Sequence, residues 1–425
     1  KMMNFGIKVD KQAGSGAYKL TLVSESITPW ENDLVSHDAT AKEYVVINST
    51  KGHLKEAITA ANKDYTKIKN LKITGEISAQ DFYFMRDSME NLAALNLKEV
   101  IIRGGEQRLT GGAQGMYPHN DYEIPYEALR GKKSLNLLVL PDKLTKIGIA
   151  AFADDQNITG SLIIPEGVTE IEVGAFYDCR SMNGTLSLPS TLKYLGRGID
   201  LWWYGGVFTY CGFTSELILP NNLECIAGNN TFAGCEGLHG ELRFPEKLTE
   251  ISDGAFNGCK SLTGSITIPQ GVHKLPTSVF QFCDNLNGTL TLPDGITSIG
   301  YNCFQGCALK GELKLPKNLT VIADEVFNGC DFSGELVLPK TIRSIGKRAF
   351  ANNWRLMGIV EFPEGLQSIG AGAFANCRMI EGLVFPESLE SIRAENSYNE
   401  DGGAFQGCYG INSIVCKSDM PAYVQ

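Results

Sequence analysis

Hydrophobic residues recur along most of the chain in one fixed pattern, and eleven prolines mark its copies. Neighbouring prolines are 23 to 25 residues apart, except for one gap of 31. The prolines are Pro141, Pro165, Pro189, Pro220, Pro245, Pro269, Pro293, Pro316, Pro339, Pro363 and Pro386. Apolar residues stand one and three positions before each proline, and aliphatic residues stand three and six positions after it. A phenylalanine follows, in most copies eleven residues after the proline.

The residues around each proline predict a short strand followed by a turn. In residues 264–269, apolar and polar side chains alternate, which is typical of a strand with one buried face. Proline ends such a strand because it has no N–H to donate to a ladder. We expect the Leu-x-x-Ile-Gly segment after the proline to turn the next corner. The Ala-Phe pair is expected to begin a short helical or irregular stretch in the middle of the coil.

Copies of this pattern predict a solenoid. One copy cannot bury its apolar face alone, whereas copies stacked in register bury a continuous core and pair each strand with the next turn. Every copy runs in the same direction, so the strands must be parallel. The chain of 425 residues therefore predicts one long array of short parallel strands, with about 23–24 residues per turn.

Nine of the twelve cysteines form a column of their own, three residues after the repeat phenylalanine. They are Cys179, Cys211, Cys235, Cys259, Cys283, Cys307, Cys330, Cys377 and Cys408. A single column cannot supply the staggered partners of a disulfide framework, and the chain lacks the C-x-x-C pairs that zinc sites use. We therefore expect mostly free thiols that act as small buried hydrophobic residues. Cys225, Cys303 and Cys416 lie outside the column.

The repeat resembles a known one. The order L-x-x-I-G-x-x-A-F-x-x-C, followed by L-x-G-x-L-x-I-P, is similar to the repeat of the BspA-like bacterial leucine-rich repeat surface protein family. Residues 248–259 are a good copy, and the match covers about residues 135–416. The resemblance implies a right-handed leucine-rich repeat solenoid that is secreted or held at the bacterial cell surface, in association with the outer membrane. It also implies adhesion to proteins of a host or of neighbouring cells.

The ends of the chain depart from the repeat. Residues 1–48 are an N-terminal extension or linker, in which residues 18–22 alternate like a strand. Residues 49–134 predict a divergent N-terminal cap and first turns, because terminal repeats meet solvent. Within them, residues 53–61 and 80–95 predict short helices, the second with a capping box at Ser78 and Asp81. Residues 135–425 are the repeat array with its C-terminal cap.

Charge and composition exclude several classes of protein. The net charge is -10 and the pI about 5.2, which is unsuited to a nucleic-acid-binding surface. No run of 18 apolar residues occurs, so we expect no transmembrane segment. A lipid anchor, if the protein has one, would lie outside this sequence.

Two insertions of eight residues interrupt the repeat at the same position, between the Leu-x-x-Ile segment and the phenylalanine. They are the first candidates for function. The first contains Trp202, Trp203 and Tyr204, and aromatic side chains in a loop are typical anchors for a protein or sugar partner. The alternative is that this loop folds back and buries them. Trp354, beside the cysteine-column position Asn353, is a further candidate that could be exposed or buried with equal reason.

The sequence lacks the motifs that usually mark catalytic and metal-binding sites. None of its five histidines lies in H-E-x-x-H, and there is no G-x-S-x-G, P-loop or dinucleotide-binding fingerprint. The second insertion, residues 393–403, carries three acids but not the spacing of a calcium loop. We therefore expect no enzymatic activity, no cofactor and no metal site.

These observations favour a recognition or adhesion protein that binds a protein partner through the surface of the solenoid. A carbohydrate-binding surface protein, with Trp202 and Trp203 as stacking platforms, is the first alternative. A passive structural spacer is the second, and it predicts that deleting residues 198–206 leaves all binding unchanged.

Overall fold

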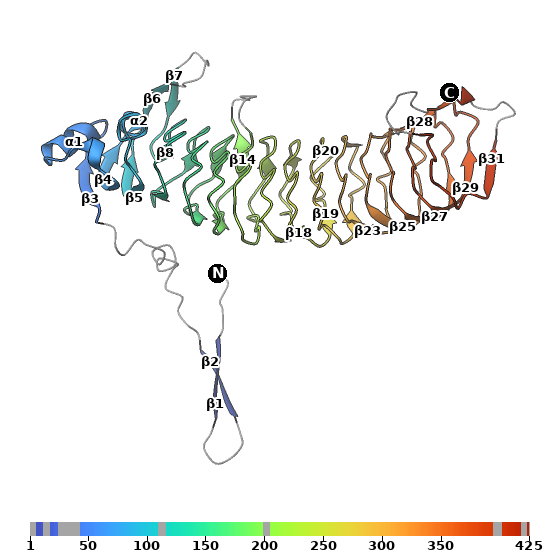
Figure 1. Ribbon diagram of the computed structural model, residues 1–425, viewed down its shortest axis with the longest axis horizontal. Helices are drawn as coiled ribbons and strands as arrows, with labels where there is room; N and C mark the ends of the chain where they lie inside the picture. The colour runs from blue at the N-terminus through green and yellow to red at the C-terminus, as the bar shows by residue number, and fades with distance from the viewer. Residues whose placement is uncertain are drawn as a thin grey trace. The chain divides into compact units, whose positions relative to one another are not determined.

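The computed structural model describes residues 6–11, 18–23, 43–108, 116–198, 205–393, 402–417 and 423–424. The chain divides into two compact units, residues 1–44 and 45–425. In the first unit, β1 (Gly6–Lys11) and β2 (Tyr18–Val23) form an antiparallel pair, with Gly6 opposite Val23. Within the described residues, all other strands and both α-helices belong to the second unit (Figure 1).

The second unit begins with a four-stranded parallel sheet in the order β3-β4-β5-β9. Its strands are Val45–Ser49, Asn70–Ile77, Ala94–Ile102 and Leu137–Val139. The connections carry α1 (Leu54–Ala60), the 3-10 helix η2 (Tyr65–Lys67) and α2 (Ala79–Ser88). A hairpin of β6 (Gly105–Arg108) and β7 (Met116–His119) follows β5. Each helix buries apolar residues on one side, Leu54 and Ile58 in α1 and Phe82 and Met85 in α2.

Asp81 fixes the beginning of α2. One oxygen of its buried carboxylate accepts the backbone N–H of Ser78 at 2.8 Å, as the predicted capping box requires. The other oxygen accepts the N–H of Leu54 at 2.9 Å and so joins the starts of the two helices. The predicted extension of α2 to Leu95 is wrong. The helix ends at Ser88 because Met89 leaves the helical backbone conformation, and the chain then enters β5.

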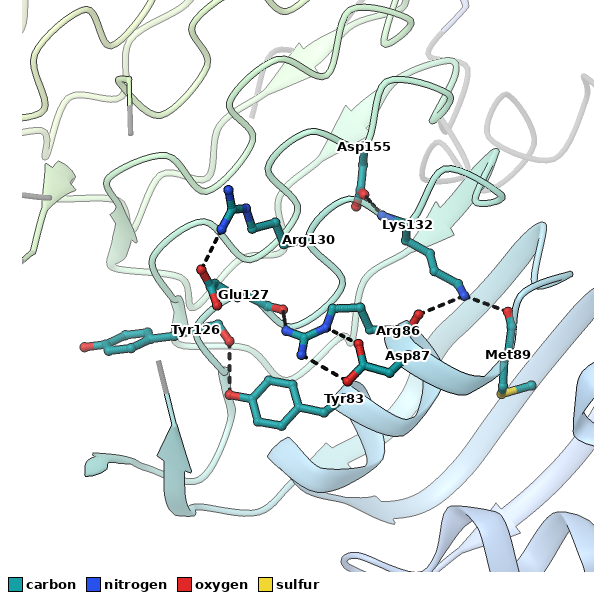
Figure 2. Close-up of polar contacts among 9 residues, drawn as sticks. All are labelled: Tyr83, Arg86, Asp87, Met89, Tyr126, Glu127, Arg130, Lys132 and Asp155. Atoms are coloured by element: carbon teal, nitrogen blue, oxygen red, sulfur yellow. Dashed lines mark hydrogen bonds and ion pairs between the residues drawn. The ribbon is translucent and has the colours of Figure 1, made fainter. Parts of the chain in front are cut away.

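Polar contacts join α2 to the first turns of the array (Figure 2). The Lys132 ammonium donates to the carbonyls of Arg86 and Met89, at 3.1 and 2.7 Å, where the helix ends. The Arg86 guanidinium donates to the carbonyl of Glu127 at 2.8 Å. A cation at the last carbonyls of a helix is favourable, because they are the negative end of its dipole. Hydrogen bonds as well as apolar packing therefore hold α2 on the array.

The array is a parallel-strand solenoid of about 14 turns, which confirms the predicted fold class. Strands of a first ladder lie just before the repeat prolines, except for the last strand, which no repeat proline follows. They are β11 (Leu162–Ile163), β13 (Leu186–Ser187), β16 (Gly240–Glu241), β18 (Leu262–Thr263), β19 (Ile266–Thr267), β21 (Leu290–Thr291), β23 (Lys310–Gly311), β25 (Asp331–Glu335), β27 (Arg355–Glu361), β29 (Met379–Phe385) and β31 (Ser413–Cys416). They are short, as expected, and each pairs in parallel with a neighbouring turn.

The Leu-x-x-Ile segment forms a second ladder of parallel strands, so the expectation that it only turns a corner is wrong. Its strands are β8 (Glu123–Ile124), β10 (Lys146–Ile147), β12 (Glu170–Glu172), β14 (Tyr194–Arg197), β15 (Cys225–Ile226), β17 (Glu250–Ile251), β20 (Lys274–Leu275), β22 (Ser298–Ile299), β24 (Val321–Ile322), β26 (Ser344–Ile345), β28 (Ser368–Ile369), β30 (Ser391–Ile392) and β32 (Tyr423–Val424). These strands form three sheets, and within each sheet the apolar residue of one turn pairs in register with that of the neighbouring turn, as Ile147 does with Ile171. Burying this column brings the backbones close enough to pair.

The repeat phenylalanines stack on one another through the middle of the array. Their ring centroids are 5.2 to 5.7 Å apart from one turn to the next, from Phe152 to Phe405. The column cysteines lie beside this stack, and eight of the nine are fully buried. Each thiol donates to the carbonyl of the phenylalanine one turn earlier, as Cys283 does to Phe256 at 3.0 Å. Asn353 takes the same role with its side-chain amide, at 2.8 Å from the carbonyl of Phe327.

Candidate functional site

The predicted site residues divide between the described and the undescribed parts of the chain. Trp202, Trp203 and Tyr204 fall in residues 199–204, outside the described residues, as do residues 394–401 of the second insertion. Trp354 is described and is 56% exposed. The guanidinium of Arg378, from the next turn, lies 5.6 Å from the centre of its ring. Of the two alternatives for Trp354, exposed or buried, the side chain is therefore exposed.

Trp354 belongs to a larger apolar surface, which we call the methionine face. It consists of five exposed apolar side chains on or beside β25, β27 and β29: Val337, Trp354, Met357, Ile359 and Met379. Met357 and Ile359 point outward because they alternate with buried residues along β27. Met357 pairs with Met379 across the ladder, and Ile359 pairs with Gly382. An apolar patch of this kind is typical of a surface that contacts another protein.

Charged groups border the methionine face. Arg355, on β27, forms an ion pair with Asp331 of β25 at 3.3 Å. Glu361, at the end of β27, is an ion-pair partner of Lys417, at 3.3 Å. An apolar centre with a polar rim is the usual anatomy of a protein–protein interface, and Trp, Met and Arg are enriched there.

A second feature concerns the residue that precedes the position of the cysteine column, which is a cysteine in nine turns and Asp155 or Asn353 in two. It has a positive φ in eleven successive turns. In nine of them it is Gly, Asn or Asp: Asp154, Asp178, Gly234, Gly258, Gly306, Gly329, Asn352, Asn376 and Gly407. The other two are Tyr210, with φ 60°, and Phe282, with φ 57°. Bulky aromatic residues rarely adopt this conformation, so both are strained.

The rings of these two residues lie on the surface of the solenoid. Tyr210 is 50% and Phe282 is 47% exposed. Each ring lies across a glycine of the following turn: a Cβ added at Gly234 would be 2.4 Å from Cδ1 of Tyr210, and one added at Gly306 would be 2.9 Å from Cδ1 of Phe282. Glycine at both positions therefore leaves the room that the rings occupy.

Tyr210 and Phe282 line the same groove, which we call the aromatic groove. Its volume is about 1020 Å³, and Gly198 and Gly205, the described residues on either side of residues 199–204, also line it. Three turns separate the two aromatic residues, a distance of roughly 14 Å at the usual strand spacing. Gly258 lies between them, and a Cβ added there would meet nothing closer than 3.8 Å. The groove is thus an open trough with an aromatic ring near either end.

The polar side chains of the aromatic groove are of both signs. Arg197, Glu236, Glu250, Lys260 and Asp284 line it. Lys260 and Glu236 form an ion pair at 2.7 Å.

Cys225, one of the three cysteines outside the column, lies close to the groove. Its thiol donates to the carboxylate of Glu250 at 3.0 Å. Burial and the Glu250 carboxylate raise the pKa of this thiol to about 12, so it stays protonated and serves as a hydrogen-bond donor.

A buried carboxyl group lies beside the groove, because Val173, the next residue in the chain, lines it. Glu172 is an ion-pair partner of Lys146 at 2.6 Å and accepts the N–H of Ile149 at 3.1 Å. Burial raises the pKa of Glu172 to about 7 despite the lysine. Its partners are all from neighbouring turns, which makes it a structural group of the array.

Other kinds of site were sought in the described part of the chain. No group of three or more His, Cys, Asp or Glu side chains in it is arranged to hold a metal ion. No helix of the described residues has both the length and the apolar character to span a bilayer.

Sequence reasoning missed Tyr210 and Phe282. The signal for them is present in the sequence, because the position before the column cysteine is Gly, Asn or Asp in the other turns. A tyrosine and a phenylalanine break that rule without any gain in core packing. Recognising this requires knowing that the position has a positive φ, which the repeat pattern alone does not give.

Comparison with known proteins gives matches of two kinds. The family described as "BspA type Leucine rich repeat region" matches in six copies, over residues 122–199, 204–333, 287–401 and 331–422. Together these ranges span more than half of the chain. A search of the curated proteins found no match.

Several solved structures are similar. One is a leucine rich cell surface protein of Faecalibacterium prausnitzii, with 21% identity over 88% of this chain and 83% of that chain and a TM-score of 0.39. Another is a leucine-rich repeat protein of Bacteroides ovatus, with 18% identity, coverage of 97% and 99%, and a TM-score of 0.44. A leucine rich repeat protein of T. pallidum has 27% identity, coverage of 44% and 69%, and a TM-score of 0.29. With TM-scores below 0.5, these likenesses add nothing to the family match.

Proposed function

Since this chain belongs to the BspA type leucine-rich repeat family, we propose that it is a non-enzymatic recognition or adhesion protein. It acts at the bacterial cell surface or after secretion, in association with the outer membrane, and it binds a protein of a host or of a neighbouring cell. The family suggests a role in protein interaction or adhesion. The binding surface that we assign is the methionine face.

One observation supports this assignment above the others: five large apolar side chains are exposed on or beside the neighbouring strands β25, β27 and β29. Exposed apolar area has to be covered by something if it is to contribute free energy, and a partner protein covers it most simply. Methionine suits such a surface because its flexible side chain adapts to the partner. Trp354, under the guanidinium of Arg378, is the expected energetic centre.

The methionine face can be tested by polar substitution. We expect Met357→Thr, Ile359→Thr and Met379→Thr together to weaken binding by a factor of ten or more, on the order of 1–3 kcal/mol for lost apolar burial. Threonine preserves the preference for strand, so the ladder stays intact. Binding is measured by surface plasmon resonance against a panel of purified extracellular-matrix proteins and against whole bacterial cells.

The matched control is Ile218→Thr, which removes an equally exposed apolar side chain, 62% exposed, far from the methionine face. It is expected to bind as the unmodified protein does. If the triple variant and the control bind alike, the methionine face is not the binding surface. If the unmodified protein binds neither protein nor cells, the spacer interpretation replaces the recognition role.

A further inference from the structure

We propose that the aromatic groove is a second, separate binding site and that it takes an uncharged glycan chain. This site goes beyond the proposed protein-binding role, which rests on the methionine face. The starting point is that Tyr210 and Phe282 are the two exceptions in a column of Gly, Asn and Asp at positive φ. Each costs about 1–2 kcal/mol of backbone strain. Neither ring offsets that cost by burial, since each is about half exposed.

The position of the rings suits them for stacking. Each ring lies against a glycine of the next turn and is about half exposed where it lines the groove. The guanidinium of Arg180 lies 5.9 Å from the centre of the Tyr210 ring. The face of an aromatic ring carries partial negative charge and attracts C–H groups that carry partial positive charge. The C–H face of a sugar ring has this character. Two such rings roughly 14 Å apart are suited to a chain of several sugars rather than to one small molecule.

The floor of the groove argues against a peptide that adds as a strand. The backbone N–H groups of Tyr210, Gly234, Gly258 and Phe282 all donate to carbonyls of the following turn, each at 2.8 Å. They are therefore not available to a peptide backbone, and strand addition depends on such free groups. Recognition in this groove falls to aromatic rings and polar side chains, which is the combination that hydroxyl-rich ligands require.

The charges of the groove argue for an uncharged ligand. Two basic side chains, Arg197 and Lys260, are balanced by the three acids Glu236, Glu250 and Asp284. A polyanionic polysaccharide needs an excess of positive charge, and a polycation needs the reverse. Carboxylates and amides in the same groove, such as Asp284 and Asn229, can accept from and donate to sugar hydroxyls.

The test uses the full chain on an array of oligosaccharides. The array carries uncharged gluco-, manno-, galacto-, xylo- and N-acetylglucosamine oligomers of two to six units, with heparin and a library of extended peptides alongside. We expect binding to one or more uncharged oligomers that strengthens with chain length. Tyr210→Asn and Phe282→Asn are each expected to weaken it about tenfold, and the double variant to abolish it.

Controls separate this site from the methionine face and from misfolding. Tyr301→Asn removes a tyrosine that is 57% exposed but does not line the groove, and it is expected to leave glycan binding unchanged. The triple threonine variant of the methionine face is also expected to bind glycan normally. Asparagine adopts a positive φ readily, so Tyr210→Asn and Phe282→Asn keep the fold, which the unfolding temperature verifies.

Three results would overturn the proposal: no uncharged oligomer bound, equal binding by the double variant, or preferred binding of heparin or peptides in competition with the oligomers. The protein-binding proposal fails on a different measurement, namely the binding of the unmodified protein and of the triple threonine variant to the protein panel and to cells.

Discussion

At the scale of single residues, the backbone conformation of the repeat restricts the residue type at a position as much as burial does. The residue before the column cysteine has a positive φ, and Gly, Asn and Asp adopt it at little cost. Tyr210 and Phe282 adopt it with strain. Natural sequences keep such departures where a function requires them. This is the physical reason for placing a binding site at these two residues and not at the other exposed tyrosines.

The strain itself can be measured. We expect Tyr210→Asn to raise the free energy of unfolding by about 1 kcal/mol, because asparagine tolerates φ 60° better than tyrosine does. Urea unfolding of both proteins gives the difference. Tyr301→Asn, at a residue without positive φ, serves as control and is expected to give no stabilisation. A destabilised Tyr210→Asn variant would show that ring packing outweighs the strain.

Glu172 makes stability depend on pH. Its pKa is about 7 in the folded protein and 4.5 as the ordinary value, so the folded state binds the proton more tightly. The contribution of protonated Glu172 to the free energy of unfolding is therefore complete below about pH 4.5, and it is lost as the pH rises through about 7. We expect the unmodified protein to lose about 1–3 kcal/mol more than Glu172→Gln between pH 5 and pH 8. Parallel pH dependences for the two proteins, followed by urea unfolding, would exclude this role.

At the scale of elements, the phenylalanine stack and the cysteine column form the rigid centre of each turn. Successive rings lie 5.2 to 5.7 Å apart, and the thiol hydrogen bonds run beside them from turn to turn. Each turn is thus bound to its neighbours through its core as well as through its two ladders. The stability lost when a phenylalanine is replaced should therefore depend on its place in the turn.

Two phenylalanines of this array, Phe256 and Phe282, permit a direct comparison. Phe256 is fully buried in the stack, and Phe256→Ala is expected to cost about 3–5 kcal/mol of stability through the cavity it leaves. Phe282 is 47% exposed, and Phe282→Ala is expected to change stability by less than about 1 kcal/mol. Equal losses in chemical denaturation would mean that Phe282 belongs to the core and not to the groove.

The cysteine column predicts the reactivity of the thiols. Burial raises the pKa of Cys235 and of Cys283 to about 12, which leaves almost no thiolate to react at neutral pH. Cys416, on β31, is exposed. A thiol titration of the native protein is expected to find about one fast-reacting group, and twelve after denaturation. Fewer than twelve in denaturant without a reducing agent would reveal disulfides.

At the scale of the whole second unit, the array needs an end that closes its core. We propose that residues 49–134 have this role, with residues 1–48 as a separate extension. The parallel sheet of β3, β4, β5 and β9 leads into the turns, and α2 is bonded to the first of them through Lys132. In a solenoid each turn contacts only its neighbours, so a weakened junction is expected to let the end open separately.

Lys132→Met tests the junction. It keeps the apolar stem and removes the ammonium that holds the carbonyls of Arg86 and Met89. We expect a loss of about 1–3 kcal/mol, since two helix-end carbonyls lose their partner. Hydrogen exchange is expected to accelerate in α2 and to stay unchanged in the turns after Pro220. Uniform acceleration along the array would instead show that the unit unfolds as one.

The sequence by itself determined what is local and repeated. The spacing of prolines, the apolar positions, the phenylalanine in the middle of each coil and the buried cysteine column all follow from one pattern, because each turn packs against a copy of itself. The two helices of residues 49–134 were equally visible in their apolar stripes. These features involve only near neighbours along the chain or the same position one turn away.

The tertiary structure alone decided what depends on how the turns stack. The second ladder exists because stacking brings the Leu-x-x-Ile backbones within pairing distance, and α2 ends at Ser88 where the chain must enter β5. Trp354 was named from the sequence, but only the stacked turns show that its side chain is exposed beside Arg378 of the next turn. Tyr210 and Phe282 are 72 positions apart and meet in one groove only because three turns of the array place them there. Exposure and proximity of this kind are properties of the stacked surface, which no single repeat contains.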